Sequence, residues 1–380
     1  MYGRQYHNKC YRMALFLVSF CFSALSYAQP DMQPLGPNIA DKGSGYYHFR
    51  VNDFQSADGA RHYRVWTAIP NKAAPPSGYP VLYMLDGNAV MDRLPEALLK
   101  QLADHSPPVI VAIGYQTNLP FDLNGRAYDY TPAPGIDREG SENNPRFHRK
   151  TGGGPAFRQL LERHIAPQVE QGITINPERR GVWGHSYGGL FVLDSWLSSS
   201  FFHIYYSASP SLSRDNFALL NRLTAVKPSP FCHKKLIIME GSASNGDSRQ
   251  RQMAELLQKV QETVRTLENN GVNAALQHYP GLGHGPMFNA SFRSALLDIS
   301  REPASQKTTL PLTRRQNMPA SGGHNPSKRG RHTGIISPTR FVIGICPFGG
   351  AIDLFIEDIA DTDIKTQVLV DIVVNVSADQ

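Results

Sequence analysis

The residues best suited to covalent chemistry in this chain of 380 residues lie around one serine. Residues 184–188 read Gly-His-Ser-Tyr-Gly, which has the form G-x-S-x-G with Ser186 at its centre. A short apolar run precedes this pentapeptide and a run dense in apolar residues follows it, as expected for a strand and then a buried helix. A serine on the sharp turn between them presents its hydroxyl at the top of the sheet, and the glycines avoid collisions there. The pattern also occurs by chance in loops rich in Gly and Ser, but this context favours Ser186 as a nucleophile.

That serine needs a base, because a hydroxyl is a weak nucleophile at neutral pH. In α/β-hydrolases the order along the chain is nucleophile, acid, histidine. His284 follows the last expected strand and lies in the Gly-rich loop 281–286, so we predict it as the general base. For the acid, Glu240 at a strand end and Asp247 in the loop after it are alternatives. A Ser-His pair without a direct acid is the third alternative.

The negative charge that develops on attack of a carbonyl group needs two hydrogen-bond donors. One is expected from the backbone N–H of the residue after the nucleophile, Tyr187. The other is expected from the turn Asp86-Gly87-Asn88, where we choose the backbone N–H of Asn88. The same three residues are also compatible with an ordinary turn. His185 is interpreted as a structural residue of the elbow.

The elements that must position these groups follow an alternating pattern. Two alternating segments separated by turn residues predict an N-terminal antiparallel hairpin, 46–51 and 61–70. Continuous apolar runs of the kind buried on both faces predict further strands, at 81–86, 109–114, 182–183, 204–208, 236–240 and 272–279. Helical segments separate these strands, so we expect an α/β-hydrolase fold with a mainly parallel central sheet and helices on both faces. The segment 115–154 lacks clear periodicity and is expected to be a lid or a binding loop, or else disordered.

The two ends of the chain differ from this body in composition. Residues 1–28 contain three basic residues and then an apolar run before Ser-Tyr-Ala, which predicts a secretory signal cleaved after Ala28 or kept as an anchor. Residues 29–300 form the expected catalytic domain, 301–340 a basic disordered linker, and 341–380 a tail of unknown role. The net charge of +6 comes mainly from the ends, which argues against nucleic-acid binding. We find no cysteine or histidine spacing typical of a metal site, and we expect no cofactor.

Three stretches of the sequence resemble a known family. They are 83–92 (Tyr-Met-Leu-Asp-Gly-Asn-Ala-Val-Met-Asp), 118–124 (Asn-Leu-Pro-Phe-Asp-Leu-Asn) and 283–292 (Gly-His-Gly-Pro-Met-Phe-Asn-Ala-Ser-Phe). Together with the serine motif they are similar to the esterase-D-type branch of α/β-hydrolases. Within that branch they look like the periplasmic trilactone esterases of the salmochelin and enterobactin siderophore system. The similarity covers roughly residues 30–300.

This resemblance implies hydrolysis of a cyclic catecholate trilactone, by preference in its iron-free form, mainly to the linear trimer. It implies a serine–histidine pair without a well-placed acid, which maps onto Ser186 and His284. It also implies a periplasmic enzyme. Such a substrate is aromatic and anionic, so we expect charge and stacking from Arg126, Tyr128 and Tyr130. A broader carboxylesterase or acyltransferase, and a siderophore-binding protein without catalysis, are the alternatives.

Overall fold

The computed structural model describes residues 31–133 and 149–301, except 216, 228–230, 232, 244 and 245. The expected signal, the tail and all but the first residue of the expected linker lie outside the described residues, so these assignments stay predictions. Among the residues described, no helix combines the length and the apolar character needed to cross a membrane.

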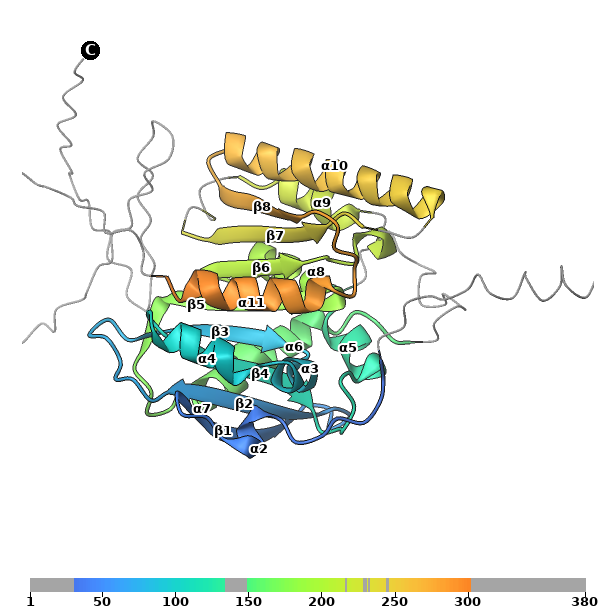
Figure 1. Ribbon diagram of the computed structural model, residues 1–380. Coiled ribbons are helices and arrows are strands. Elements are labelled where there is room, and N and C mark those ends of the chain that lie inside the picture. Colours follow the sequence, from blue (N-terminus) through green and yellow to red (C-terminus); the bar gives the residue numbers. More distant parts are fainter. Residues whose placement is uncertain are drawn as a thin grey trace, which may run out of the picture. The chain divides into compact units, whose positions relative to one another are not determined.

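Eight strands form one sheet in the order β1-β2-β4-β3-β5-β6-β7-β8 (Figure 1). Their bounds are β1 (Tyr47–Gln55), β2 (His62–Pro70), β3 (Tyr79–Leu85), β4 (Val109–Tyr115), β5 (Ile175–His185), β6 (Ile204–Ala208), β7 (Lys235–Gly241) and β8 (Asn273–Tyr279). The pairs β1/β2 and β2/β4 are antiparallel, and all other neighbours are parallel. The predicted fold class, a mainly parallel sheet with an N-terminal hairpin, is confirmed.

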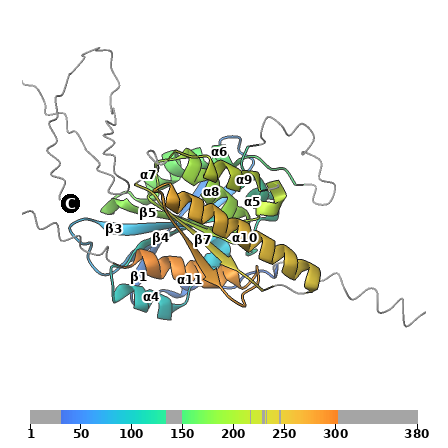
Figure 2. The ribbon, with the colours of Figure 1, turned by 90° about the horizontal axis from the view of Figure 1, so that it is seen from above.

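Helices cover both faces of this sheet (Figure 2). One face carries α2 (Ile39–Lys42), α3 (Gly87–Asp92), α4 (Glu96–Ala103) and α11 (Met287–Ile299). The other carries α6 (Gly154–Leu160), α7 (Ala166–Val169), α8 (Tyr187–Ser198), α9 (Ala218–Thr224) and α10 (Asp247–Asn269). A π-helical turn, Leu161–Ile165, joins α6 to α7, and Leu212–Asp215 form a short 3-10 helix.

The core is split by the sheet into two apolar clusters. Successive side chains of a strand point to opposite faces, and Val182 and Trp183 of β5 accordingly belong to different clusters. All seven residues of β3 and of β4 are buried. This explains why both strands appear in the sequence as continuous apolar runs rather than as alternating patterns.

The strand order brings the turn after β3 and the turn after β5 side by side, at the carboxyl ends of these two strands. The chain moves from β3 to β4 on one side and then returns to place β5 on the other side of β3. A crevice forms outside the carboxyl ends of the strands at such a reversal, and ligands of open α/β sheets bind there. Asp86 follows β3 and Ser186 follows β5, so both lie at this point.

One expectation about the segment 115–154 is wrong. It contains a helix, α5 (Leu123–Asp129), which begins at a conventional N-cap: the side chain of Asp122 accepts hydrogen bonds from the backbone N–H groups of Asn124 and Gly125. The helix is only two turns long and mixes polar with small residues, so hydrophobic periodicity does not reveal it. Residues 134–148 of the same segment are not described.

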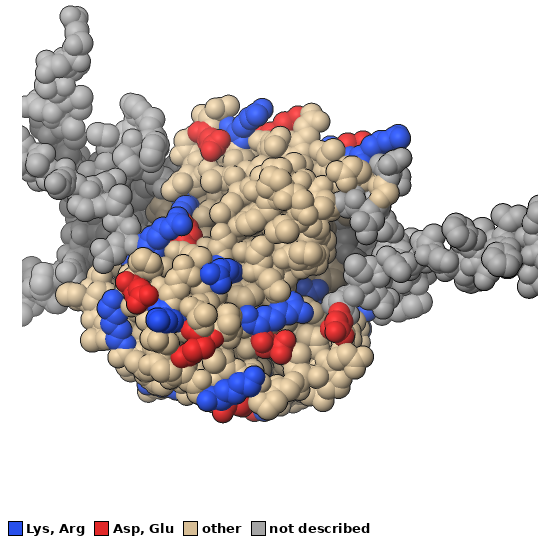
Figure 3. All heavy atoms as spheres, in the orientation of Figure 1, with Lys and Arg blue, Asp and Glu red and all other residues tan. Residues whose placement is uncertain are grey.

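The face covered by α4 and α11 carries basic and acidic side chains that are interspersed (Figure 3). No large area of one sign appears on this face. The distribution agrees with the nearly balanced charge of residues 29–300 in the sequence.

Candidate active site

Ser186 occupies a strained turn between β5 and α8. Its φ is 62° and its ψ is −112°, a region that non-glycine residues rarely adopt. The turn is tight enough that a Cβ on Gly184 would come 2.4 Å from the backbone oxygen of Gly188. Only glycine fits at position 184, which is the physical reason for the motif. The structure thus places Ser186 on the nucleophile elbow that the sequence predicts.

The imidazole of His284 reaches this serine from the loop between β8 and α11. Its Nε2 lies 3.0 Å from Ser186 Oγ, within hydrogen-bond distance. The loop is held on both sides: the Leu282 carbonyl accepts a hydrogen bond from Ala243 N–H, and the His284 carbonyl accepts one from Nε2–H of His185 at 2.8 Å. The rings of His185 and His284 lie 4.7 Å apart. These contacts agree with the interpretation of His185 as a structural residue. Its side chain holds the loop that carries His284.

The surroundings of His284 keep it in the neutral form that a general base requires. Desolvation of the ring by the surrounding protein, and next the positive charge of Arg126, lower the pKa of His284 below its usual value of 6.5, although the residue itself is exposed to solvent. A neutral Nε2 can accept the proton of Ser186. The geometry and the protonation state agree with the predicted roles, which the experiments below test directly.

The carboxylate that would orient His284 is absent from the contacts of the described residues. Glu240, one predicted alternative, ends β7 and accepts a hydrogen bond from Ser209 Oγ at 2.9 Å instead. Glu240 is buried, and burial raises its pKa from 4.5 to about 7. The side chain of Asp247 is not described, so that alternative stays a prediction. In the described part of the chain, Ser186 and His284 form a pair without a direct acid.

The predicted oxyanion donors lie at the starts of two helices. Tyr187 is the first residue of α8 and Asn88 the second of α3. The Asn88 side chain locks its turn to the end of β4, donating to the carbonyls of Tyr115 and Thr117 and accepting from Tyr115 N–H. The backbone nitrogen of Asn88 packs against Gly114 of β4, where a Cβ would come 2.8 Å from it. No contact in the described chain links this nitrogen to Ser186, so the oxyanion role of Asn88 stays a prediction.

Arg126 supplies a positive charge beneath the nucleophile elbow. Its Nε and Nη2 donate to Asp86 Oδ1 and Oδ2, each at 2.8 Å, and Nη2 also donates to the His185 carbonyl at 3.3 Å. The guanidinium carbon lies 5.3 Å from the centroid of the Tyr187 ring. Arg126 therefore ties the turn after β3 to the residue before the nucleophile. Its positive charge contributes to the lowered pKa of His284.

Arg126, Tyr128 and Tyr130, from which we expect charge and stacking toward the substrate, differ in their exposure. Arg126 is only 8% exposed and Tyr130 is fully buried, with its hydroxyl accepting from Asp86 N–H at 3.2 Å. Both belong to α5 and its end rather than to a solvated loop, so stacking of Tyr130 on a ligand is excluded in this conformation. Tyr128 is half-buried and lines a pocket, so its role in binding stays a prediction.

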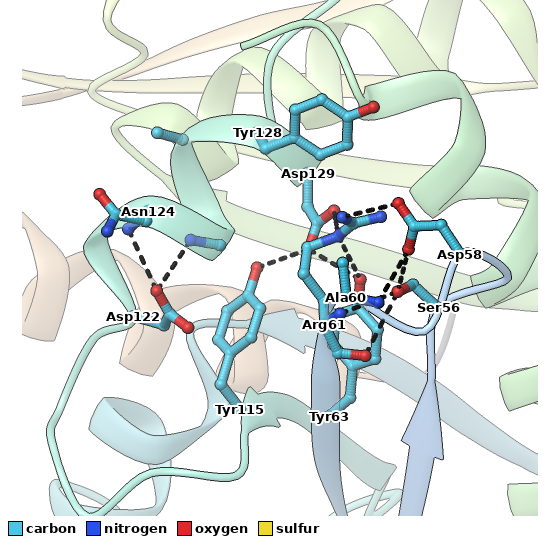
Figure 4. Close-up of polar contacts among 12 residues, drawn as sticks. Ser56, Asp58, Ala60, Arg61, Tyr63, Tyr115, Asp122, Asn124, Tyr128 and Asp129 are labelled. Carbon is cyan, nitrogen blue, oxygen red and sulfur yellow. Dashed lines mark hydrogen bonds and ion pairs between the residues drawn. The ribbon is translucent and has the colours of Figure 1, made fainter. Parts of the chain in front are cut away.

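The guanidinium group of Arg61 lines that pocket and is held in place by two carboxylates (Figure 4). Arg61 Nε lies 2.8 Å from Asp129 Oδ1, and Nη1 donates to Asp58 Oδ2 at 3.2 Å. Asp129 is buried and also accepts from the hydroxyls of Tyr63 and Tyr115. The Arg61 guanidinium lies 4.6 Å from the centroid of the Tyr128 ring. The pocket has a volume of about 620 Å³.

Among the described residues, no cluster of three or more His, Cys, Asp or Glu side chains is arranged to hold an ion. The reacting groups that the structure brings together are a hydroxyl, an imidazole and a nearby guanidinium. This set is typical of nucleophilic catalysis on esters.

Comparison with known proteins agrees with this geometry. The family described as "Putative esterase" matches residues 56–299, and the chain belongs to this family. The matched range contains Ser186, His284 and every strand from β2 to β8.

Individual relatives narrow the class further. The chain is 62% identical over 309 residues to the apo-salmochelin esterase of Escherichia coli O6:H1 strain CFT073, covering 80% of this chain and 97% of the relative. It is 28% identical over 241 residues to the ferri-bacillibactin esterase BesA of Bacillus subtilis strain 168, covering 62% and 83%. Among solved structures, the enterobactin hydrolase IroE in complex with DFP is 63% identical, with a TM-score of 0.62, covering 70% of this chain and 100% of that chain. The fold and the enzyme class, a serine esterase, are thereby confirmed.

Two features of the site escaped the sequence interpretation. Asp86 was considered only as part of a turn, although its position directly after a buried strand marks it as a residue of the sheet edge. Ser211, whose Oγ lies 3.0 Å from Ser186 Oγ, was not considered. It follows β6, the strand beside β5, and a polar residue just after a strand next to the nucleophile strand is the signal that could have revealed it.

Proposed function

We propose that this protein hydrolyses ester bonds of cyclic catecholate trilactone siderophores of the enterobactin and salmochelin type, mainly to the linear trimer. The observation that carries the proposal is the 3.0 Å contact between His284 Nε2 and Ser186 Oγ on a nucleophile elbow. The substrate class is supported by the relatives, which include an apo-salmochelin esterase, a ferri-bacillibactin esterase and an enterobactin hydrolase.

The reaction follows from the arrangement of these groups. Ser186 Oγ attacks a lactone carbonyl carbon and its proton moves to His284 Nε2. The ring C–O bond then breaks, and the leaving alcohol takes that proton from His284. Water, activated by the now neutral His284, attacks the acyl group and releases the acid and free Ser186.

The tetrahedral intermediate carries a negative oxygen, which requires donors or positive charge nearby. The Tyr187 N–H is one donor by its position after the nucleophile. For the second, the buried Arg126 guanidinium is an alternative to the Asn88 N–H, because Arg126 lies against Tyr187 and His185. A guanidinium held by a carboxylate needs no reorganisation when the negative charge develops.

The pocket beside α5 is suited to an aromatic anion. Tyr128, Arg149 and Lys150 line it, and in the described part of the chain neither Arg149 nor Lys150 has an ion-pair partner. The carboxylate of Asp58 is paired with Arg61, and that of Asp122 caps α5. We expect Tyr128→Ala to raise KM for the trilactone more than for a neutral phenyl ester. Equal effects on the two substrates would remove Tyr128 from the substrate contacts.

We further propose that the protein acts in the periplasm. The support is the sequence of residues 1–28, with its basic start, its apolar run and its small residues before Gln29. Cell fractionation of the full chain, with mass spectrometry of its N-terminus, distinguishes a cleaved signal from a retained inner-membrane anchor. Recovery in the cytosol with residues 1–28 intact would contradict the proposal.

The first experiment is chromatography of iron-free enterobactin incubated with the full chain and with its Ser186→Ala variant. Linear trimer from the wild type alone is the expected result. Activity on a simple phenyl ester without trilactone hydrolysis would favour a broader carboxylesterase. Binding of the trilactone without any turnover, unchanged in Ser186→Ala, would favour a binding protein.

A further inference from the structure

Ser186 has a second hydroxyl at its side. Ser211 Oγ lies 3.0 Å from Ser186 Oγ, the same distance that separates His284 Nε2 from that oxygen. Ser211 N–H also donates to the Ser186 carbonyl at 3.2 Å. The two serines are therefore joined at both backbone and side chain. The backbone hydrogen bond places Ser211 beside the nucleophile independently of the rotamer of its side chain.

The segment before Ser211 is held by hydrogen bonds to the nucleophile elbow and to β7. Ala208 at the end of β6 accepts from Ser186 N–H at 2.9 Å, and Ser209 N–H donates to Met239 of β7 at 2.8 Å. Ser209 has φ 37° and is buried, and its hydroxyl donates to Glu240 Oε1. Glu240, at the strand end from which an acid was expected to support His284, thus supports the segment that carries Ser211.

The direction of the hydrogen bond between the serines follows from the base. Neutral His284 can accept at Nε2 only if Ser186 directs its one hydroxyl proton there. Ser211 must then be the donor to Ser186 Oγ. A donor at the attacking oxygen stabilises the negative charge that this oxygen gains as its proton leaves.

We infer that Ser211 is a third catalytic residue, which donates a hydrogen bond to Ser186 Oγ while His284 takes the proton of Ser186. This inference rests on the proposed serine mechanism. During the step the Ser186 O–H bond breaks, the bond from Ser186 Oγ to the carbonyl carbon forms, and Ser211 keeps its own proton. No carboxylate among the described residues contacts His284, and Ser211 lowers the free-energy cost of deprotonating Ser186 by acting on the nucleophile itself.

The test compares Ser211→Ala, Ser211→Thr and, as a matched control, Ser213→Ala at an exposed serine two residues away. Each full-length variant is assayed on iron-free enterobactin and on phenyl acetate. The rate of inactivation by diisopropyl fluorophosphate, in which Ser186 Oγ displaces fluoride from phosphorus, is measured as well. For Ser211→Ala we expect kcat to fall about 10- to 100-fold, as for loss of one hydrogen bond to a group that becomes charged, with KM little changed.

Three comparisons separate this role from a structural one. The inactivation rate should fall by about the same factor as kcat on both substrates, because the hydrogen bond acts on the nucleophile. Ser211→Thr should recover much of the rate, and Ser213→Ala should match the wild type. An inactivation rate for Ser211→Ala at or above the wild-type rate would overturn the inference. So would a loss explained by a fall in Tm that Ser211→Thr shares. Absence of wild-type activity on either substrate would instead refute the proposed function.

Discussion

The buried ion pair between Arg126 and Asp86 gives the most demanding prediction about this fold. The side chains are 9% and 1% exposed, and the guanidinium also donates a hydrogen bond to the His185 carbonyl. Asp86 has φ 56°, which asparagine tolerates as well as aspartate does. The substitution Asp86→Asn therefore removes the negative charge while it preserves side-chain shape and the turn.

The expected cost follows from the uncompensated charge left on Arg126. Breaking a buried pair by removing one partner destabilises a protein by about 3–5 kcal/mol. For a domain of this size each kcal/mol lowers Tm by roughly 2–4 °C. We therefore expect Asp86→Asn to lower Tm by roughly 6–20 °C, and to impair catalysis because Arg126 would move relative to the nucleophile elbow.

The matched control is Asp53→Asn. Asp53 forms a similar two-bond pair with Arg64, but these side chains are 48% and 43% exposed. An exposed pair contributes about 0–1 kcal/mol, so Tm should change little. Both variants are compared by urea denaturation and by phenyl acetate hydrolysis. If Asp86→Asn costs no more free energy of unfolding than Asp53→Asn does, the reasoning from burial is refuted.

Three further predictions concern pH and the elbow. Because desolvation and the charge of Arg126 lower the pKa of His284, the acidic limb of kcat/KM should lie below pH 6.5, and Arg126→Gln should shift it upward; a wild-type limb above 6.5 would contradict this. The folded-state pKa of Glu240 is raised from 4.5 to about 7, so the folded form holds its proton longer and stability is lost as pH rises through this window. Glu240→Gln should abolish that loss, and a Tm-against-pH profile unchanged by the substitution would count against it. Gly184→Ala should abolish labelling by diisopropyl fluorophosphate, because its Cβ would meet the Gly188 carbonyl; wild-type labelling would show that the turn adapts.

The sequence alone determined the fold class and predicted Ser186 and His284 as the reacting pair. Continuous apolar runs indicate strands that are buried on both faces, and alternating patterns indicate the N-terminal hairpin. Each pattern depends on local backbone geometry, so each strand could be predicted from its own segment. Ser186 was recognisable because its turn excludes a Cβ at Gly184, a constraint that acts within five residues. His284 followed from chain order, since the loop after the last strand ends at the same sheet edge as the nucleophile turn.

Only the tertiary structure decided which distant side chains meet. Arg126 was expected to face a substrate, but packing of α5 places it against Asp86, 40 residues earlier in the chain. Glu240 was an alternative support for His284, yet it contacts Ser209, and Ser211 contacts the nucleophile instead. Sequence patterns predict turns and the buried faces of helices and strands. They do not distinguish one serine or carboxylate from the many others of the same type. The strand order and the packing of helices on the sheet decide which partner each of these side chains contacts. Neither the strand order nor the helix packing can be predicted from a single segment of the chain.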